Sequence, residues 1–261
     1  MQEILVYGFL IFFICSFIGY FMEVFWVFLG THKWVNRGFL CGPIIPIYGW
    51  GAVLILFCLL RYYDDPVVVF VFGIIITSAL EYFASFLLEK IFHNKWWDYS
   101  SIRFNLNGRI CLRNSIAFGV LALVVIYFVT PLLGLLFSLA SFKFWSILAL
   151  ILFIFVALDT VYSIIIAYNL RNRIIIVEEL KNEKLAKIPV LFDKKLKELT
   201  ANFKAFPNRL LKAFPDLEKT YHTSFEKMKS YREQEKQRRK ELRLNAKEHL
   251  KSLKNNSKNE R

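Results

Sequence analysis

Two carboxylates stand inside long apolar stretches of this chain, and each is followed by a polar linker that contains an arginine. Glu23 precedes Arg37, and Glu81 precedes Arg109, with tryptophan, asparagine and glycine residues in both linkers. A charge near the centre of a bilayer costs roughly 2.5–3.5 kcal/mol, so a carboxylate there is normally paired or faces a cavity. Acids with arginines nearby could bind a polar or anionic molecule, or perform general acid–base chemistry on it.

A third acid, Asp159, also lies within an apolar stretch. We expect Glu23, Glu81 and Asp159 to act as charge or proton partners in a polar vestibule, with Arg37 and Arg109 as anion contacts paired with the glutamates. The remaining candidate binding residues lie in the second linker: Asp98, Tyr99, Asn105 and Asn107. The asparagines would also satisfy backbone groups, and glycines such as Gly38 and Gly108 would permit close turns.

The same residues also fit a purely structural role. A buried Glu–Arg pair can hold helices together without binding a ligand, and Asp159 fits either role equally well. Glu89, at the end of its apolar stretch, is expected to face solvent. We assign no catalytic residue and no cofactor, and no metal, because His32 and His93 have no cysteine or acid at metal-ligand spacing. The chain also lacks the P-loop motif, so it does not bind ATP through one.

The elements that must position these residues are membrane helices. The chain is 56% hydrophobic, with 27 Phe among 261 residues, and its mean hydropathy is +0.41. A membrane-spanning helix needs about 20 predominantly apolar residues. The sequence therefore predicts an all-α protein with a transmembrane domain over residues 1–170, in which five spans cover about 4–29, 43–60, 66–88, 114–136 and 144–168.

Lysine and arginine counts orient the predicted bundle, because cytoplasmic loops are enriched in both. The linkers at 31–42 and 90–113 carry two and five, whereas the loops at 61–65 and 137–143 carry one each. We therefore expect the N-terminus outside, the C-terminus in the cytoplasm, and both linkers on the cytoplasmic side. The three acids then fall in the inner half of their spans.

The two units of acid and linker resemble an internal duplication of the first four spans. Ile18-Gly-Tyr-Phe-Met-Glu23-Val-Phe25 aligns with Ile76-Thr-Ser-Ala-Leu-Glu81-Tyr-Phe83, with Ile, Glu and Phe at equal offsets. Both linkers continue with tryptophan, then an arginine beside a glycine, and a cysteine. This order predicts a parallel two-fold repeat, and substrate sites of transporters often lie between such repeats.

Residues 171–261 form a second, basic region. They carry 25 of the 34 Lys and Arg residues against 13 of the 21 acids, so nearly all of the net charge of +13 belongs here. From Phe192 to Met228, apolar residues recur every three or four positions, with Pro207 and Pro215 interrupting. This pattern predicts a cytoplasmic amphipathic helix on anionic lipids, or alternatively a coiled coil. Beyond Tyr231 we expect a solvated helix or disorder.

Several motifs resemble a known bacterial family. They are Asn36-Arg-Gly-Phe-Leu-Cys-Gly-Pro43 with Pro46-Ile-Tyr-Gly49, then Trp96-Trp-Asp-Tyr-Ser100 and Phe104-Asn-Leu-Asn-Gly-Arg-Ile-Cys111. Over about residues 5–170, the chain is similar to the family catalogued as "putative ABC transporter type IV", the CmpB-like permeases. The resemblance implies a multi-pass protein of the bacterial inner membrane, and it carries over no catalytic residue.

Our leading functional hypothesis is a permease or transporter component with a polar, cytoplasm-facing vestibule for a polar or anionic solute. A second hypothesis is a membrane-embedded enzyme that acts on a lipid or nucleotide-linked headgroup, and a third is a non-catalytic scaffold or sensor that uses the tail. The expected partners are the lipid bilayer and its anionic lipids. A separate ATPase subunit and a homo-oligomer are left open, and nucleic acid is not expected.

Overall fold

The computed structural model describes residues 1–93 and 95–179, together with scattered residues between 219 and 245; side chains from 170 to 179 are not described. Within this part of the chain the protein is all-α apart from one small hairpin. Four helical runs are long and apolar enough to cross a membrane. The protein is therefore a multi-pass membrane protein, as the composition predicts.

The four long runs correspond to the first, third, fourth and fifth predicted spans. They are α1 (Gln2–Thr31), α3 (Pro66–Phe92), the run Leu112–Ser138, and α6 (Phe142–Glu179). The third run consists of α4 (Leu112–Val124), η2 (Val125–Val129), which is a π-helical turn, and α5 (Thr130–Ser138). The π turn directly precedes Pro131, whose missing N–H cannot continue the α-helical ladder. The Thr130 hydroxyl donates to the Val125 carbonyl there, at 2.7 Å.

The second predicted span is a shorter helix in the structure. It comprises α2 (Pro46–Leu59) and the 3₁₀ turn η1 (Leu60–Tyr62), and it is apolar throughout its first 14 residues. Pro46 occupies its first turn, where a missing backbone N–H costs nothing. Because of its length, membrane crossing by this second predicted span stays a prediction.

Local sequence signals explain where α3 begins and where α1 and α3 end. The Asp65 carboxylate accepts the Val68 N–H at the start of α3, at 3.1 Å, and Pro66 follows as the first helical residue. Both helices end at a histidine in the left-handed conformation, His32 with φ 53° and His93 with φ 55°. Each of these histidines donates its N–H to a carbonyl four residues earlier, which closes the last turn.

The helices pack in sequence order, and small residues bring their backbones together. α1 lies along α2, α2 along α3, and α3 along α4. A side chain at Gly49 would overlap Phe12 of α1, and one at Gly73 would overlap Ala122 of α4. The Ser78 hydroxyl donates to that of Ser115 between α3 and α4, at 2.8 Å. Small residues and hydroxyl pairs at such contacts are typical of packed membrane helices.

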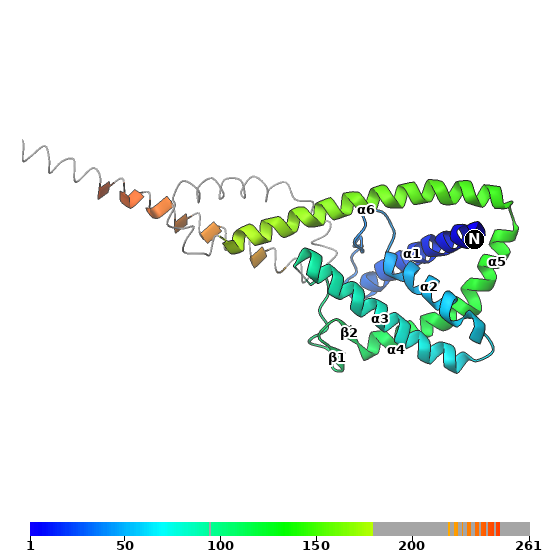
Figure 1. Cartoon of the computed structure of the whole chain (residues 1–261). Coiled ribbons are helices and arrows are strands. Elements are labelled where there is room, and N and C mark those ends of the chain that lie inside the picture. Colours follow the sequence, from blue (N-terminus) through cyan, green and yellow to red (C-terminus); the bar gives the residue numbers. More distant parts are fainter. Residues whose placement is uncertain are drawn as a thin grey trace, which may run out of the picture. The chain divides into compact units, whose positions relative to one another are not determined.

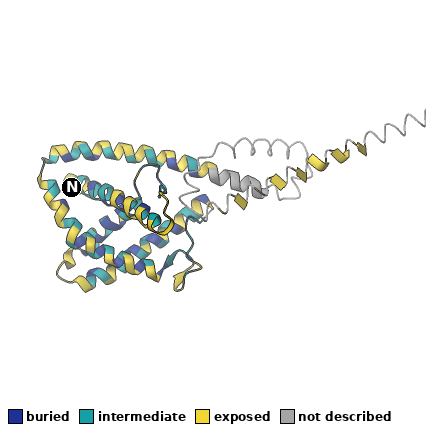
Figure 2. Cartoon of the chain, turned by 180° about the vertical axis from the view of Figure 1, so that it is seen from behind, coloured by how far each residue is buried: buried dark blue, intermediate teal, exposed yellow. Residues whose placement is uncertain are grey.

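Two apolar cores lie among the residues that the structure describes. One core lies between α2, α3, α4 and η2, around Ile55, Val69 and Ile126. The other joins α1 to α6 through Leu10, Trp145 and Ala149. In Figure 1, α1 lies between α6 and the pair α3 and α4. Figure 2 shows exposed residues along the outer faces of the helices, where a membrane protein meets lipid.

The second linker folds into a hairpin that the sequence analysis treated only as a polar segment. Strands β1 (Asn105–Leu106) and β2 (Ile110–Cys111) pair antiparallel. Asn107 and Gly108 both have positive φ, 55° and 71°, and the Arg109 N–H donates to the Leu106 carbonyl at 3.0 Å. These features define the Asn-Gly turn that matches strand twist. The glycine therefore has the turn role that we expected of it.

The predicted amphipathic tail lies almost wholly outside the described residues. The helix α6 runs past residue 168, where the last predicted span ends, to Glu179. The residues described between 219 and 245 are helical. Among them, Lys229 pairs with Glu226 and Lys236 with Glu233, one helical turn apart.

Candidate functional site

Glu23 of α1 is held by residues from the first linker and from α2. The Tyr48 hydroxyl donates to Glu23 Oε1 at 2.8 Å, and Arg37 Nη2 lies 3.6 Å from Glu23 Oε2. Gly19, one turn before Glu23, faces the Tyr48 ring so closely that a Cβ there would overlap it. The predicted pairing of Glu23 with Arg37 is therefore present, and Tyr48 is a further partner.

Glu81 of α3 is more deeply buried, with 4% of its surface exposed. The Tyr99 hydroxyl donates to Glu81 Oε1 at 3.3 Å, whereas Glu81 Oε2 is buried without a hydrogen-bond partner. Tyr99 is positioned by the hairpin, because its N–H donates to the Gly108 carbonyl at 2.7 Å. Burial, together with the negative charge of Glu81, raises the pKa of the Tyr99 phenol. Tyr99 therefore stays protonated and remains a donor.

These two sites are neighbours. Tyr48, which donates to Glu23, lines the same cavity as Glu81. We call Glu23, Tyr48, Glu81 and Tyr99 the Glu/Tyr cluster. It brings two carboxylates and two phenol donors together from α1, α2, α3 and the second linker. Such a group can exchange protons or hold a polar ligand, and the low dielectric around it strengthens each interaction.

The structure corrects the expected partner of Arg109. Arg109 Nη2 lies 2.7 Å from Glu89 Oε2, and Nη1 donates to the Tyr82 hydroxyl at 3.3 Å. Glu81 is therefore not its ion-pair partner. Glu89, expected to face solvent, keeps 33% of its side chain exposed but pairs with Arg109. Tyr82 and Glu89 are seven residues apart, which places them on one face of α3, whereas Glu81 points about 100° away. Asn107 Nδ2 also donates to the Tyr82 hydroxyl, at 2.9 Å.

Asp159 binds the first linker. Its two carboxylate oxygens accept the backbone N–H groups of Cys41, at 3.0 Å, and Gly42, at 2.8 Å. The hydroxyl of Ser163, one turn further along α6, accepts the Cys41 N–H as well, at 3.2 Å. All the hydrogen bonds described for Asp159 go to this linker and to Ser163. Asp159 thus fastens the linker to α6 and lies apart from the hydrogen bonds of the Glu/Tyr cluster.

Asp98 and Asn105 order the second linker. Asp98 Oδ1 accepts the Ser100 N–H at 3.0 Å, and Asp98 Oδ2 lies 3.3 Å from Lys95 Nζ. The Ser100 N–H, ahead of Lys95, holds the pKa of Asp98 below its usual value. Asn105 donates to the Ile102 carbonyl at 2.7 Å and accepts the Gly108 N–H at 3.0 Å. As expected of the asparagines, Asn105 satisfies backbone groups of the linker.

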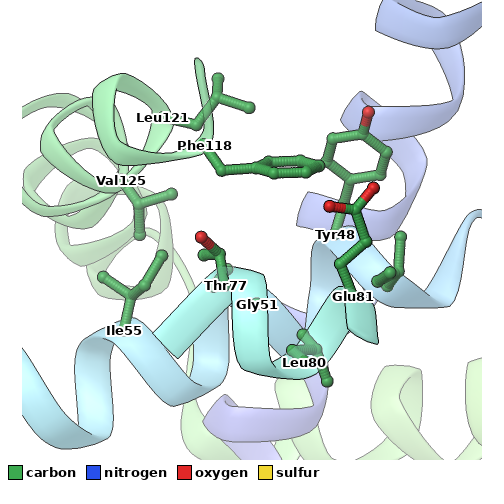
Figure 3. A pocket seen from close by; sticks show the side chains of 11 residues that line it. Tyr48, Gly51, Ile55, Thr77, Leu80, Glu81, Phe118, Leu121 and Val125 are labelled. Atoms are coloured by element: carbon green, nitrogen blue, oxygen red, sulfur yellow. The ribbon is translucent and has the colours of Figure 1, made fainter. Parts of the chain in front are cut away.

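A cavity of about 50 Å³ lies beside Glu81, between α2, α3, η2 and α4. Figure 3 shows the Glu81 carboxylate near the Tyr48 ring, with the Phe118 ring reaching from α4 toward Tyr48. The cavity places buried Glu81 against a small space, and the polar, cytoplasm-facing vestibule expected from the sequence stays a prediction.

Tyr48 and Tyr82 are site residues that were not predicted from the sequence. Tyr48 stands in the quoted Pro46-Ile-Tyr-Gly49 motif, and its hydroxyl is a natural donor for an intramembrane acid, so this motif could have identified it. Tyr82 directly follows Glu81, but it accepts from Arg109 and Asn107 and does not donate to Glu81, so its place in the sequence would have suggested the wrong partner.

Comparison with known proteins agrees with these motifs. The model of the family described as "Putative ABC-transporter type IV" matches residues 10–164, more than half of the chain. The chain belongs to this family. The matched residues include Glu23, Tyr48, Glu81, Tyr99 and Arg109. No curated protein and no solved structure matches the chain.

Proposed function

We propose that this chain is the membrane-embedded component of a transporter, and that the Glu/Tyr cluster receives a polar solute. The observation that carries the proposal is the convergence of two intramembrane carboxylates, each with a tyrosine donor from the following segment. An ionisable residue inside a membrane is costly and usually marks a pathway for a substrate, ion or proton. Membership of an ABC-transporter family supports the same function.

The proposal includes the predicted topology, with the N-terminus outside and both linkers in the cytoplasm of a bacterial cell. In this topology α2 and η1 together form the second span. Their 17 residues, Pro46–Tyr62, extend about 25 Å at 1.5 Å per residue, somewhat short of a hydrocarbon core of about 30 Å. Local thinning of the bilayer accommodates a short span at modest cost. The Glu/Tyr cluster would then open toward the cytoplasm.

The two-fold repeat belongs to the same proposal. Both α1 and α3 carry an acid that accepts a tyrosine hydroxyl, and both end at a left-handed histidine. The two tyrosines come from the segments that follow these helices in the chain. These parallels support an arrangement in which the solute is bound between two related halves.

The ion pairs bear on the charge of the solute. Arg37 faces Glu23, and Arg109 faces Glu89 at 2.7 Å. An anionic solute would have to compete with these glutamates for the arginines, which favours a neutral or cationic polar solute over the anionic one that we also considered. Because the sequence has no P-loop, a separate ATPase subunit would supply the energy of transport.

Metabolite profiling of bacteria tests the transport proposal. A strain without the gene would be complemented with wild type, with Glu23→Gln/Tyr48→Phe, or with Tyr127→Phe. The last variant removes a hydroxyl that donates to the Tyr63 carbonyl, away from the cluster. We expect the distribution of a polar metabolite between cells and medium to change in the deletion strain and to be restored by wild type and Tyr127→Phe only.

The lipid composition of the same strains separates the two leading hypotheses. A transporter leaves the lipid composition unchanged, whereas a missing or accumulated lipid would favour the membrane-embedded enzyme and overturn the proposal. Purification of the tagged protein in a mild detergent tests for the energy source, and an ATPase subunit is expected to copurify.

A further inference from the structure

The cavity beside Glu81 combines one buried acid with mainly apolar walls. Its volume is about 50 Å³, and its lining includes Gly51 and Ile55 of α2, Leu80 of α3, and Leu121 of α4. Thr77 and Tyr48 are its other polar residues, and their hydroxyls donate elsewhere, to the Gly73 carbonyl and to Glu23. The two hydroxyl oxygens can still accept hydrogen bonds, and Glu81 is the ionisable group of this lining, with one carboxylate oxygen that no donor satisfies.

Glu81 lines this space and carries an acceptor oxygen that no donor satisfies. Tyr99 binds its Oε1, while Oε2 is buried without a hydrogen-bond partner in a residue that is only 4% exposed. None of the residues that line the cavity carries a positive charge. Arg37 contacts Glu23, as predicted, and Arg109 contacts Glu89 rather than Glu81. A buried carboxylate is stable only with a counter-charge or a proton. The lining of this cavity supplies no counter-charge for Glu81.

The walls favour one kind of counter-charge. The rings of Tyr48 and Phe118 pack edge to face, with centroids 6.1 Å apart, and both line the cavity. Aromatic rings attract ammonium groups through their negative faces, and a carboxylate beside them adds an ion pair. A hard metal ion requires about six oxygen ligands, which these apolar walls do not supply. A space of about 50 Å³ holds roughly one or two water-sized groups.

We propose that this cavity binds a small ammonium-type cation, such as ammonium itself or a one-carbon primary amine. The cation would donate to Glu81 Oε2 and lie against the rings of Tyr48 and Phe118 (Figure 3). This inference rests on the proposed transport function and names a class of solute or co-transported ion for it. The test of this inference measures cation binding. If no cation binds, the inference fails, but the metabolite profiles still test the transport function independently.

The test is cation binding by the full-length protein in lipid nanodiscs. Methylammonium, ammonium, sodium and tetramethylammonium chlorides would be compared at equal ionic strength, by the Tm of unfolding and by calorimetric titration. We expect a saturable rise in Tm with ammonium and methylammonium. Sodium should cause none, because the cavity offers too few oxygen ligands to replace its hydration shell, and tetramethylammonium should cause none, because it is too large.

Substitution of Glu81 tests the carboxylate. In Glu81→Gln we expect methylammonium affinity to fall roughly tenfold to a hundredfold, which corresponds to the loss of one charge-assisted hydrogen bond. Glu3→Gln is the control, because Glu3 is an exposed residue at the start of α1 whose removal changes the net charge equally. Equal affinity in wild type and Glu81→Gln would place the cation elsewhere and overturn the proposal.

Substitution of Gly51 tests the cavity without altering the acid. A Cβ at Gly51 would lie 3.8 Å from Leu80 Cδ2, in ordinary contact, so alanine fits and reduces the space. We expect Gly51→Ala to weaken methylammonium binding more than ammonium binding. Gly134→Ala is the matched control, since a Cβ there meets no atom within 4 Å. This pair keeps the proposal testable even if Glu81→Gln does not fold.

Two further outcomes would overturn the proposal. Equal stabilisation by sodium and methylammonium would indicate a general effect of salt. If no cation stabilises the protein while its stability depends on pH through Glu81, the occupant is a proton rather than an amine.

Discussion

Arg109 Nη2 lies 2.7 Å from Glu89 Oε2, so Arg109 pairs with Glu89, while the hydrogen-bond donor to Glu81 is the Tyr99 hydroxyl. The two acids lie on one helix, eight residues apart, and have different environments. Glu89, near the end of α3, neutralises an arginine of the hairpin, whereas Glu81 is buried against a cavity. The contact therefore separates a structural ion pair from the candidate site.

Removal of Arg109 should destabilise the protein. We expect Arg109→Ala to lower the free energy of unfolding, because it breaks a charge-assisted hydrogen bond and leaves the half-buried Glu89 carboxylate without its partner. Arg103→Ala is the control, since Arg103 lies over the exposed ring of Phe104 in the same linker. Thermal unfolding in detergent measures both. Equal losses would mean that the Arg109–Glu89 pair contributes no more than an exposed contact.

The Tyr99 hydroxyl should stabilise the buried carboxylate. Tyr99→Phe would leave both oxygens of Glu81 without a donor, which we expect to cost about 1–3 kcal/mol. Tyr162→Phe removes a hydroxyl from a residue of α6 that is 57% exposed and serves as the control. The double variant Tyr99→Phe/Glu81→Gln should recover part of the loss, because it removes the unpaired charge. An additive double variant would show that the two side chains are not coupled.

Asp159 should hold the first linker against α6. In Asp159→Ala we expect faster amide hydrogen exchange in peptides that contain Cys41 and Gly42, because both N–H groups lose their acceptor. Asp64→Ala alters an exposed acid in the turn before α3 and should leave this exchange unchanged. Hydrogen exchange followed by mass spectrometry reads out both variants. Unchanged protection in Asp159→Ala would mean that the linker is held by other contacts.

Asp98 should make the stability of the folded protein depend on pH in the acidic range. Its pKa is lowered in the folded state, chiefly by the Ser100 N–H, so the ionised form is favoured by folding. The resulting stabilisation is present above the unfolded pKa of about 3.9 and disappears as the pH falls through the lower folded value. We therefore expect wild type to exceed Asp98→Asn in Tm at neutral pH and the difference to shrink below about pH 4. A constant difference across this range would contradict the assignment.

Reporter fusions test the proposed topology. Fusions after Asp64 and Phe142 should be external, and fusions after Lys95 and Arg261 should be cytoplasmic, because the basic linkers stay inside. A cytoplasmic signal at Asp64 would mean that α2 does not span the membrane, or that the bundle has the opposite orientation. In the second case the Glu/Tyr cluster would open to the outside.

The sequence by itself determined the long helices, since runs of apolar residues with few charges can satisfy their backbone only as helices in lipid. It also located the acids within these helices and the Asn107–Gly108 turn, because both follow from local residue types. The tertiary structure decided which side chains meet. Partner choice depends on the rotation of α3 and on the path of the hairpin, so Arg109 reaches Glu89 rather than Glu81. Tyr48 likewise contacts Glu23 because Gly19 lets its ring approach α1, a relationship that spacing along the chain does not contain.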